Sequence, residues 1–195
     1  KPLSDKVDTK VGRLLKLAKT KKIFCMVGFN LRFMPIVQKI TQLLKQKILG
    51  KILTSDLYVG QYLPDWRPIS KYEETYSALF KKGGGAALDL IHEVDLAFHW
   101  FGPLSSPNII SHKLSDLKTD VEDYVHFNTN KPPAITVTLD TLNKIKTRQY
   151  RIIGTLGSVY CDVYRTYACW TSKDGKQKEY TKKADFDTQE SFFNE

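Results

Sequence analysis

Three consecutive glycines, Gly83-Gly84-Gly85, open the stretch of sequence that most constrains the fold, and Gly102-Pro103 closes it. Glycine adopts positive φ angles at no steric cost, so the run permits a sharp entry into a helix. Glycine followed by proline is a typical helix end. Residues 86–101 therefore predict one helix, and its apolar residues cover so much of the circumference that we expect the helix to be buried.

Four titratable residues lie on this otherwise apolar helix within about 120° of one another on a helical wheel: Asp89, His92, Asp95 and His99. Burying such groups costs free energy unless they are paired or used, so they indicate either a site or internal pairing. We expect Asp95 and His99 to be structural. For His92, a core histidine bonded to a backbone carbonyl is the alternative. Imidazole and carboxylate bind Zn²⁺ or Mn²⁺, but the spacing matches no standard metal motif, and we predict no metal site.

Residues 1–29 predict the last α–β unit of a doubly wound, dinucleotide-binding domain. Apolar residues recur at helical spacing from Val7 to Ala18. Residues 23–29 form a continuous apolar run, typical of a strand covered on both faces in a parallel sheet, and such a strand requires a neighbouring strand. Because the chain opens on Lys1-Pro2 rather than on methionine, we interpret it as a fragment of a longer protein.

Residues 30–195 predict an α+β domain for substrate binding and oligomerisation. An amphipathic helix follows Pro35, a half-covered strand spans residues 51–62, and short strand candidates separated by turns follow Pro103. The candidates span residues 109–114, 124–128, 135–142, 147–155, 158–163, 168–171 and 177–181, and another helix starts near residue 186. Successive hairpins predict an open, mainly antiparallel sheet of about six strands with helices on one face.

The composition is that of an ordinary globular protein, with 42% hydrophobic and 26% charged residues. No apolar run approaches the roughly 18 residues of a membrane span, so we expect no membrane partner. The three cysteines have no metal-ligand spacing, which favours free thiols and a cytoplasmic location. The net charge of +9 comes from scattered lysines, which indicate a solvated surface or attraction of anionic small molecules, and we expect no nucleic-acid partner.

Three segments carry a resemblance to a known family: residues 27–35, residues 58–68 and residues 83–102 with the motif Leu88-Asp89-Leu90-Ile91-His92-Glu93. With the Lys1-Pro2 pair, they resemble the C-terminal part of the Gfo/Idh/MocA family of NAD(P)-dependent oxidoreductases. The likeness is greatest to members associated with sugar-nucleotide and sialic-acid-type biosynthesis. It implies a parent dehydrogenase or reductase acting on a CH-OH group of a sugar, cyclitol or sugar-nucleotide, and a homo-oligomer formed through the open sheet face.

The resemblance also implies roles for individual residues. Lys1-Pro2 matches the end of the family's Glu-Lys-Pro tripeptide, which places Lys1 at the catalytic centre and both residues beside the cofactor. His92 would accept the hydroxyl proton as hydride leaves, since imidazole titrates near neutral pH, and Lys1 would stabilise the developing alkoxide. Asp89 would orient His92 or bind a sugar hydroxyl.

Five further residues are candidates for substrate binding: Asn30, Arg32, Tyr62, Asp65 and Trp66. Asn30 and Arg32 follow a predicted strand end, where ligand sites of α/β proteins concentrate. Arg32 either binds an anionic group or pins the junction between strand and helix. The other three offer stacking and hydrogen bonds to a sugar, or else anchor a loop at the sheet edge.

The family's Gly-x-Gly-x-x-Gly dinucleotide fingerprint is absent from this sequence. We therefore expect NAD or NADP to be the cofactor of the full-length parent and not to bind this chain alone, which we expect to be inactive. The alternative is a non-catalytic binding or dimerisation module with a degenerate site.

Overall fold

The computed structural model describes residues 2–4 and 9–181. Helix α1 (Thr9–Thr20) is followed by an extended segment, the 3-10 helix η1 (Asn30–Phe33) and helix α2 (Pro35–Lys45). After the first strand come the 3-10 helices η2 (Leu63–Trp66), η3 (Tyr72–Glu74), η4 (Tyr76–Ala78) and η5 (Phe80–Lys82), then helices α3 (Ala86–Asp89) and α4 (His92–Phe101). The strands are β1 (Ile52–Gly60), β2 (Pro107–His112), β3 (Tyr124–Thr129), β4 (Ala134–Asp140), β5 (Thr147–Gly154), β6 (Gly157–Asp162), β7 (Tyr167–Ser172) and β8 (Gln177–Tyr180).

In the described part of the chain, eight strands form one sheet in the order β2-β3-β4-β1-β5-β6-β7-β8. Every neighbouring pair is antiparallel except β1 and β4, which run parallel. The α+β class and the mainly antiparallel sheet are confirmed, but the expected strand number of about six is wrong. The number is eight because every predicted strand candidate joins the same sheet. Strand β1 lies between β4 and β5 and pairs with both, which connects the two halves of that sheet.

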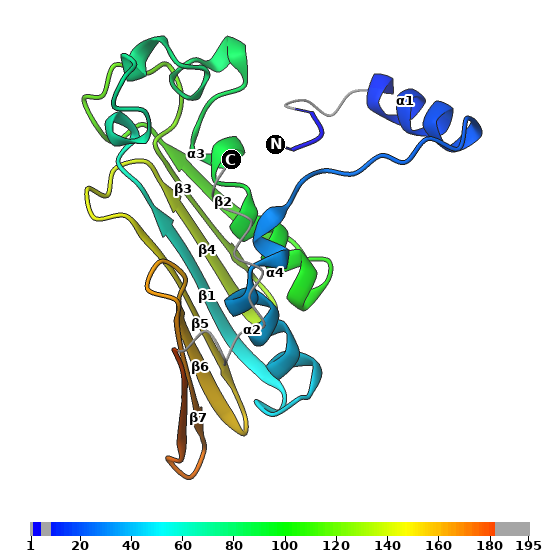
Figure 1. Ribbon diagram of the computed structural model, residues 1–195, viewed down its shortest axis with the longest axis vertical. Coiled ribbons are helices and arrows are strands. Elements are labelled where there is room, and N and C mark those ends of the chain that lie inside the picture. Colours follow the sequence, from blue (N-terminus) through cyan, green and yellow to red (C-terminus); the bar gives the residue numbers. More distant parts are fainter. Residues whose placement is uncertain (1, 5–8, 182–195) are drawn as a thin grey trace.

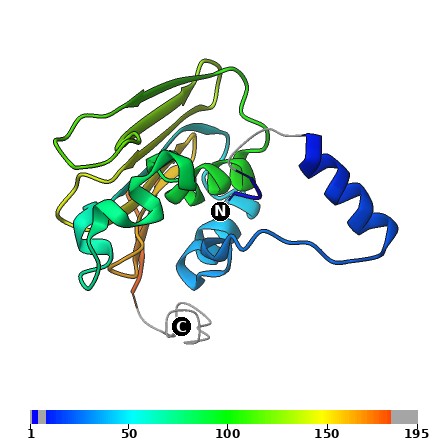
Figure 2. The same ribbon diagram turned by 90° about the horizontal axis from the view of Figure 1, so that it is seen from above.

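Helices α2, α3 and α4 cover one face of the sheet, as Figure 2 shows from above. The strands alternate accordingly: in β3, Val125 and Phe127 are buried, while His126 between them is half-exposed. Ile36 and Ile40 of α2 are buried against the same core. The prediction of helices on one face is confirmed, and the face that carries His126 has no helix over it among the described residues.

The single helix predicted over residues 86–101 is wrong, because the structure divides it into α3 and α4. Leu90 leaves the helical conformation, with φ −100° and ψ 20°. The two pieces have separate anchors. Glu122 accepts hydrogen bonds from the backbone N–H groups of Ala86 and Ala87 at the start of α3, whereas Asp95 of α4 accepts hydrogen bonds from the Arg32 guanidinium. Asp89 therefore ends one helix and His92 begins the next.

The segment that precedes η1 also differs from the prediction. Residues 23–29 form no strand in the described structure, although they are extended. Phe24 is 84% exposed, and α1 contains no buried residue. No described strand lies beside this segment to complete its hydrogen bonds, and Figure 1 shows it leading away from the sheet to α1. The helix predicted near residue 186 lies outside the described residues.

Candidate functional site

An ion pair fixes η1 against α4. The guanidinium of Arg32 donates to both carboxylate oxygens of Asp95, from Nε to Oδ2 at 2.7 Å and from Nη2 to Oδ1 at 2.5 Å. The bond to Asp95 raises the pKa of Arg32, against the opposing effect of burial. Of the two interpretations of Arg32, this pairing favours the structural one, and Asp95 has the structural partner that we expected. Asn30, at the start of η1, is exposed.

His92 contacts Phe29, the residue before η1. Its ring meets Phe29 edge-on, with 5.9 Å between ring centroids, and the Arg32 guanidinium lies 5.7 Å from the centre of the same Phe29 ring. His92 is only 5% exposed. The residue is thus buried at the first position of α4, in contact with the segment that enters η1.

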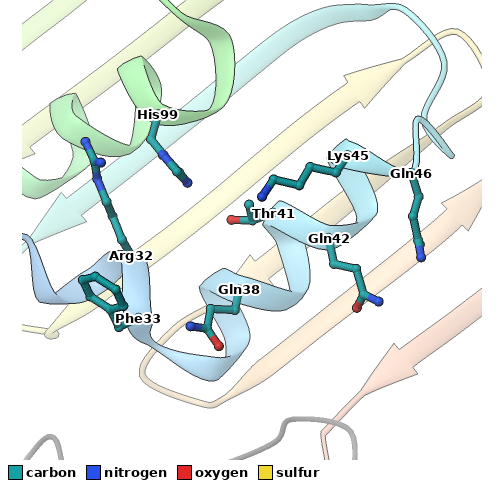
Figure 3. A pocket seen from close by; sticks show the side chains of 8 residues that line it. All are labelled: Arg32, Phe33, Gln38, Thr41, Gln42, Lys45, Gln46 and His99. Carbon is teal, nitrogen blue, oxygen red and sulfur yellow. The ribbon is translucent and has the colours of Figure 1, made fainter.

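A first cavity, of about 540 Å³, lies between α2 and α4, and we call it the His99 cavity. Figure 3 shows Lys45 reaching from α2 and His99 from α4 into the space between the helices. Burial lowers the pKa of His99, and the positive charges of Arg32 and Lys45 lower it further, while Asp95 opposes them. The lining residues are Arg32, Phe33, Gln38, Thr41, Gln42, Lys45, Gln46 and His99.

A second cavity, of about 430 Å³, contains Asp89, and we call it the Asp89 cavity. Pro2 borders it, so the structure brings together two of the predicted site residues; Lys1 lies outside the described residues. Burial raises the pKa of Asp89, while the nearby Ser77, Tyr76 and Arg67 lower it in part. The lining residues are Pro2, Leu3, Ser4, Tyr76, Lys81, Lys82, Gly83, Leu88 and Asp89.

The glycine run shapes one wall of the Asp89 cavity. Gly83 and Gly85 have φ angles of 75° and 114°, which favour glycine. A Cβ atom on Gly84 would lie 2.6 Å from the carbonyl oxygen of Ser77, so the middle glycine is required by close contact with the preceding segment. The expected sharp entry into the helix is confirmed.

A third cavity, of about 310 Å³, gathers Tyr62, Asp65 and Trp66, and we call it the Tyr62 cavity. Its remaining lining residues are Gln61, Arg67, Lys144 and Lys146. The Tyr62 and Asp89 cavities adjoin at Arg67, because its guanidinium lies 4.7 Å from the centre of the Tyr76 ring, and Tyr76 lines the Asp89 cavity. The predicted residues of the loop at 62–66 thus come together, but Asn30 and Arg32 lie elsewhere.

The sequence analysis did not identify the lysines of the Asp89 cavity or those of the Tyr62 cavity. Lys81 and Lys82 directly precede the glycine run, and that position was a usable signal. Lys144 and Lys146 occupy alternate positions in the turn between β4 and β5, and only the strand pairing shows that this turn lies beside Tyr62.

Among residues 2–4 and 9–181, no group of three or more His, Cys, Asp and Glu side chains is arranged to hold a metal ion. No helix within those ranges has the length and apolar character needed to cross a membrane.

A family model described as the GFO/IDH/MocA C-terminal domain matches residues 37–160, which is more than half of the chain. A comparison with curated proteins found no match. Solved structures match the fold. An inositol dehydrogenase homologue from Azotobacter vinelandii, complexed with NAD+, has a TM-score of 0.76 and 10% identity, over 89% of this chain and 47% of that one.

Two other solved structures extend the comparison. An oxidoreductase from Agrobacterium radiobacter, in complex with NAD+, L-tartaric acid and magnesium, has a TM-score of 0.75 and 16% identity over 93% of this chain and 52% of that one. The WlbA dehydrogenase from Bordetella pertussis, in complex with NADH and UDP-GlcNAcA, has a TM-score of 0.71 and 18% identity over 83% of this chain and 47% of that one. The chain therefore spans about half the length of the structures it matches, and the likeness at these identities is one of fold.

Proposed function

We propose that this chain, which belongs to the GFO/IDH/MocA family through its C-terminal domain, is the substrate-binding part of an NAD- or NADP-dependent oxidoreductase. The reaction is oxidation or reduction at a hydroxyl or ketone of a sugar, a cyclitol or a sugar-nucleotide. Residues 30–195 form this part, and residues 1–29 belong to the dinucleotide-binding part. The known structures with which the fold is shared include complexes with NAD+ and with NADH plus UDP-GlcNAcA.

The observation that carries this proposal is the Asp89 cavity. It places a half-buried carboxyl with a raised pKa beside Pro2 and the ammonium groups of Lys81 and Lys82. A carboxyl whose pKa is raised toward the working pH can hold and release a proton. Cations at the same wall stabilise negative charge that develops on a substrate oxygen.

A nicotinamide cofactor bound beside this cavity would exchange hydride with the substrate carbon. Pro2 and Lys1 would border it. His92 accepts the hydroxyl proton during oxidation, and its contact with Phe29 fixes the orientation of the imidazole ring. Asp89, one residue before the break between α3 and α4, binds the substrate hydroxyl.

The test uses the protein expressed from its complete reading frame. NADH binding is measured by fluorescence titration, and turnover is assayed with a panel of sugars, cyclitols and sugar-nucleotides. His92→Ala should lower turnover by about 10²-fold or more in a protein that still folds, which circular dichroism checks. His112→Ala, at an exposed position of β2, is the matched control and should retain full turnover. Full turnover in His92→Ala would contradict the proposed role.

The alternative function, a binding or dimerisation module, draws on the sheet face opposite the helices. Half-buried aromatic side chains of Tyr58, Tyr124 and Tyr160 belong to that face, and aromatic residues are common in interfaces. A homo-oligomer through this face fits both functions. Sedimentation that shows a dimer, together with no NADH binding, would favour the module over the enzyme.

A further inference from the structure

We propose that the Tyr62 cavity binds the anionic group, a phosphate or a carboxylate, of a charged sugar substrate whose reacting carbon lies in the Asp89 cavity. The inference rests on the proposed function of the Asp89 cavity and adds to it a substrate class and two residues, Lys144 and Lys146, that select for it. A substrate without a negative charge would leave this cavity's cations unused.

The charge of the Tyr62 cavity is the first support. Three cationic side chains, Arg67, Lys144 and Lys146, face the single carboxylate of Asp65. Over the whole chain the ratio is 30 to 21, so the cavity is far more basic than the average of the protein. A concave surface with an excess of one sign raises the local concentration of oppositely charged ligands.

The two lysines keep their donors available. The ammonium of Lys144 lies 5.4 Å from the centre of the Tyr62 ring, and that of Lys146 lies 4.5 Å from the centre of the Tyr164 ring. No carboxylate within residues 2–4 and 9–181 forms an ion pair with either of them. An ammonium over an aromatic face still has N–H donors that point away from the ring, so each lysine can donate to an anionic oxygen.

The backbone that carries these lysines is ordered in advance. One carboxylate oxygen of Asp140 accepts hydrogen bonds from the backbone N–H groups of Leu142 and Asn143, both at 2.9 Å. The Asn143 side chain donates to the Tyr58 hydroxyl at 2.9 Å and accepts from the backbone N–H of Ile145 at 3.0 Å. A loop fixed in this way loses little conformational entropy when a ligand binds.

Arg67 joins the two cavities and sets the direction of the ligand. It lines the Tyr62 cavity, it stacks on Tyr76 of the Asp89 cavity, and its charge reaches Asp89, whose pKa it lowers. A substrate that extends from Asp89 past Arg67 toward Lys144 places its reacting carbon at one end and its negative charge at the other. Tyr62 and Trp66 offer flat apolar surfaces between them.

The test measures binding by isothermal titration calorimetry on the full chain, with inorganic pyrophosphate and glucuronate as anionic probes and glucose as the uncharged probe. At least one anion should bind at least ten-fold more tightly than glucose. The double variant Lys144→Gln/Lys146→Gln should weaken that binding at least ten-fold and leave the thermal unfolding midpoint unchanged. Which anion binds distinguishes a phosphate from a carboxylate as the recognised group.

The matched control is Lys173→Gln/Lys178→Gln, which removes the same charge near the far edge of the sheet. Lys178 also lies over an aromatic ring, 5.6 Å from the centre of Tyr180, so the control repeats the cation–π contact as well. It should leave anion binding unchanged. Binding that is equally weakened by both variants, or by neither, would overturn the proposal, as would the absence of binding by both anions.

The result is separable from that of the proposed function. Loss of anion binding in the Lys144→Gln/Lys146→Gln variant supports the anion cavity even where no NADH-dependent turnover is found. Conversely, NADH-dependent turnover that requires His92, together with anion binding that ignores the two lysines, upholds the oxidoreductase and rejects the anion cavity.

Discussion

The guanidinium of Arg148 forms an ion pair with the carboxylate of Glu93 inside the core, with 2.8 Å between Nε and Oε1. Glu93 is fully buried and also accepts a hydrogen bond from the Tyr150 hydroxyl at 2.9 Å. Burial raises the pKa of Glu93, while the charge of Arg148 and the bond from Tyr150 lower it in part. The pair ties β5 to the first turn of α4, directly after His92.

Breaking this pair should cost more from one side than from the other. Glu93→Leu leaves a buried guanidinium that cannot lose its proton, so we expect a loss of about 3–5 kcal/mol in the free energy of unfolding. Arg148→Met should cost less, because Glu93 can take up a proton. The double variant should lose less than the sum of the two single variants. Urea denaturation checks all three, and additive losses would contradict the direct pairing.

The buried charge of Asp89 should lower the stability of the protein while it contributes to turnover. Since burial raises its pKa above that of the unfolded chain, the group contributes most to stability at low pH and that contribution is lost as the pH rises through the folded pKa. Asp89→Asn, which removes the buried charge, should therefore raise the thermal unfolding midpoint at pH 7 and lower turnover of the complete protein. A lower midpoint would show that the charge is stabilising.

Asp123 has the opposite linkage. Burial acts to raise its pKa, but bonds from the backbone N–H groups of Leu114 at 2.6 Å and Ser115 at 2.9 Å, among others, lower it overall. Its contribution to stability is present above the unfolded pKa of about 3.9 and is lost as the pH falls through the folded pKa. Asp123→Asn should lower the free energy of unfolding by about 1–3 kcal/mol at pH 7. It should also make that free energy depend less on pH in acid. Asp174→Asn, in an exposed turn, should change neither.

Gly60 should be required for the loop that carries Lys144. A Cβ atom there would overlap the Tyr58 hydroxyl and lie 2.8 Å from Cβ of Asn143. Gly60→Ala should destabilise the protein by about 1–3 kcal/mol. Burial and the bond to Asp140 raise the pKa of Tyr58 to about 12, and ultraviolet titration should show it falling in this variant. Gly12→Ala, with open space around it, is the control and should not destabilise.

The pKa of His99 should report the charge of Lys45 across the His99 cavity. Removing a positive charge that lowers a pKa must raise that pKa, so Lys45→Ala should move the pKa of His99 upward. Proton NMR of the imidazole signals gives the value directly. Lys39→Ala, on the same helix but beside Tyr180, should have a smaller effect. An equal shift in both variants would mean that only the overall charge matters.

The strands were predictable because their signals are local. Alternation in residues 124–128 and the turn signals around them gave β3 within one residue. The position of β1 in the middle of the sheet was not predictable, since it depends on a parallel pairing with β4 across about eighty residues of intervening chain. Local patterns contain no information about such a partner.

In the candidate site, too, local features were predictable from the sequence and contacts between distant segments were not. The cavity at Asp89 follows from the glycine run, which is visible in the sequence. The break at Leu90 is not visible, because helix propensity favours continuation and the break arises from anchors at Glu122 and Arg32 that come from distant segments. For the same reason Lys144 could be placed beside Tyr62 only by the tertiary structure.

The extended segment before η1 has a consequence for the life of the protein in a cell. Ile23, Phe24 and Met26 are 61%, 84% and 67% exposed, and an extended apolar segment is what holdase chaperones bind and what pairs with the edges of other sheets. Proteases and chaperones continuously survey such segments. A neighbouring strand that pairs with residues 23–29 would therefore remove a surface that chaperones and the edges of other sheets can otherwise bind.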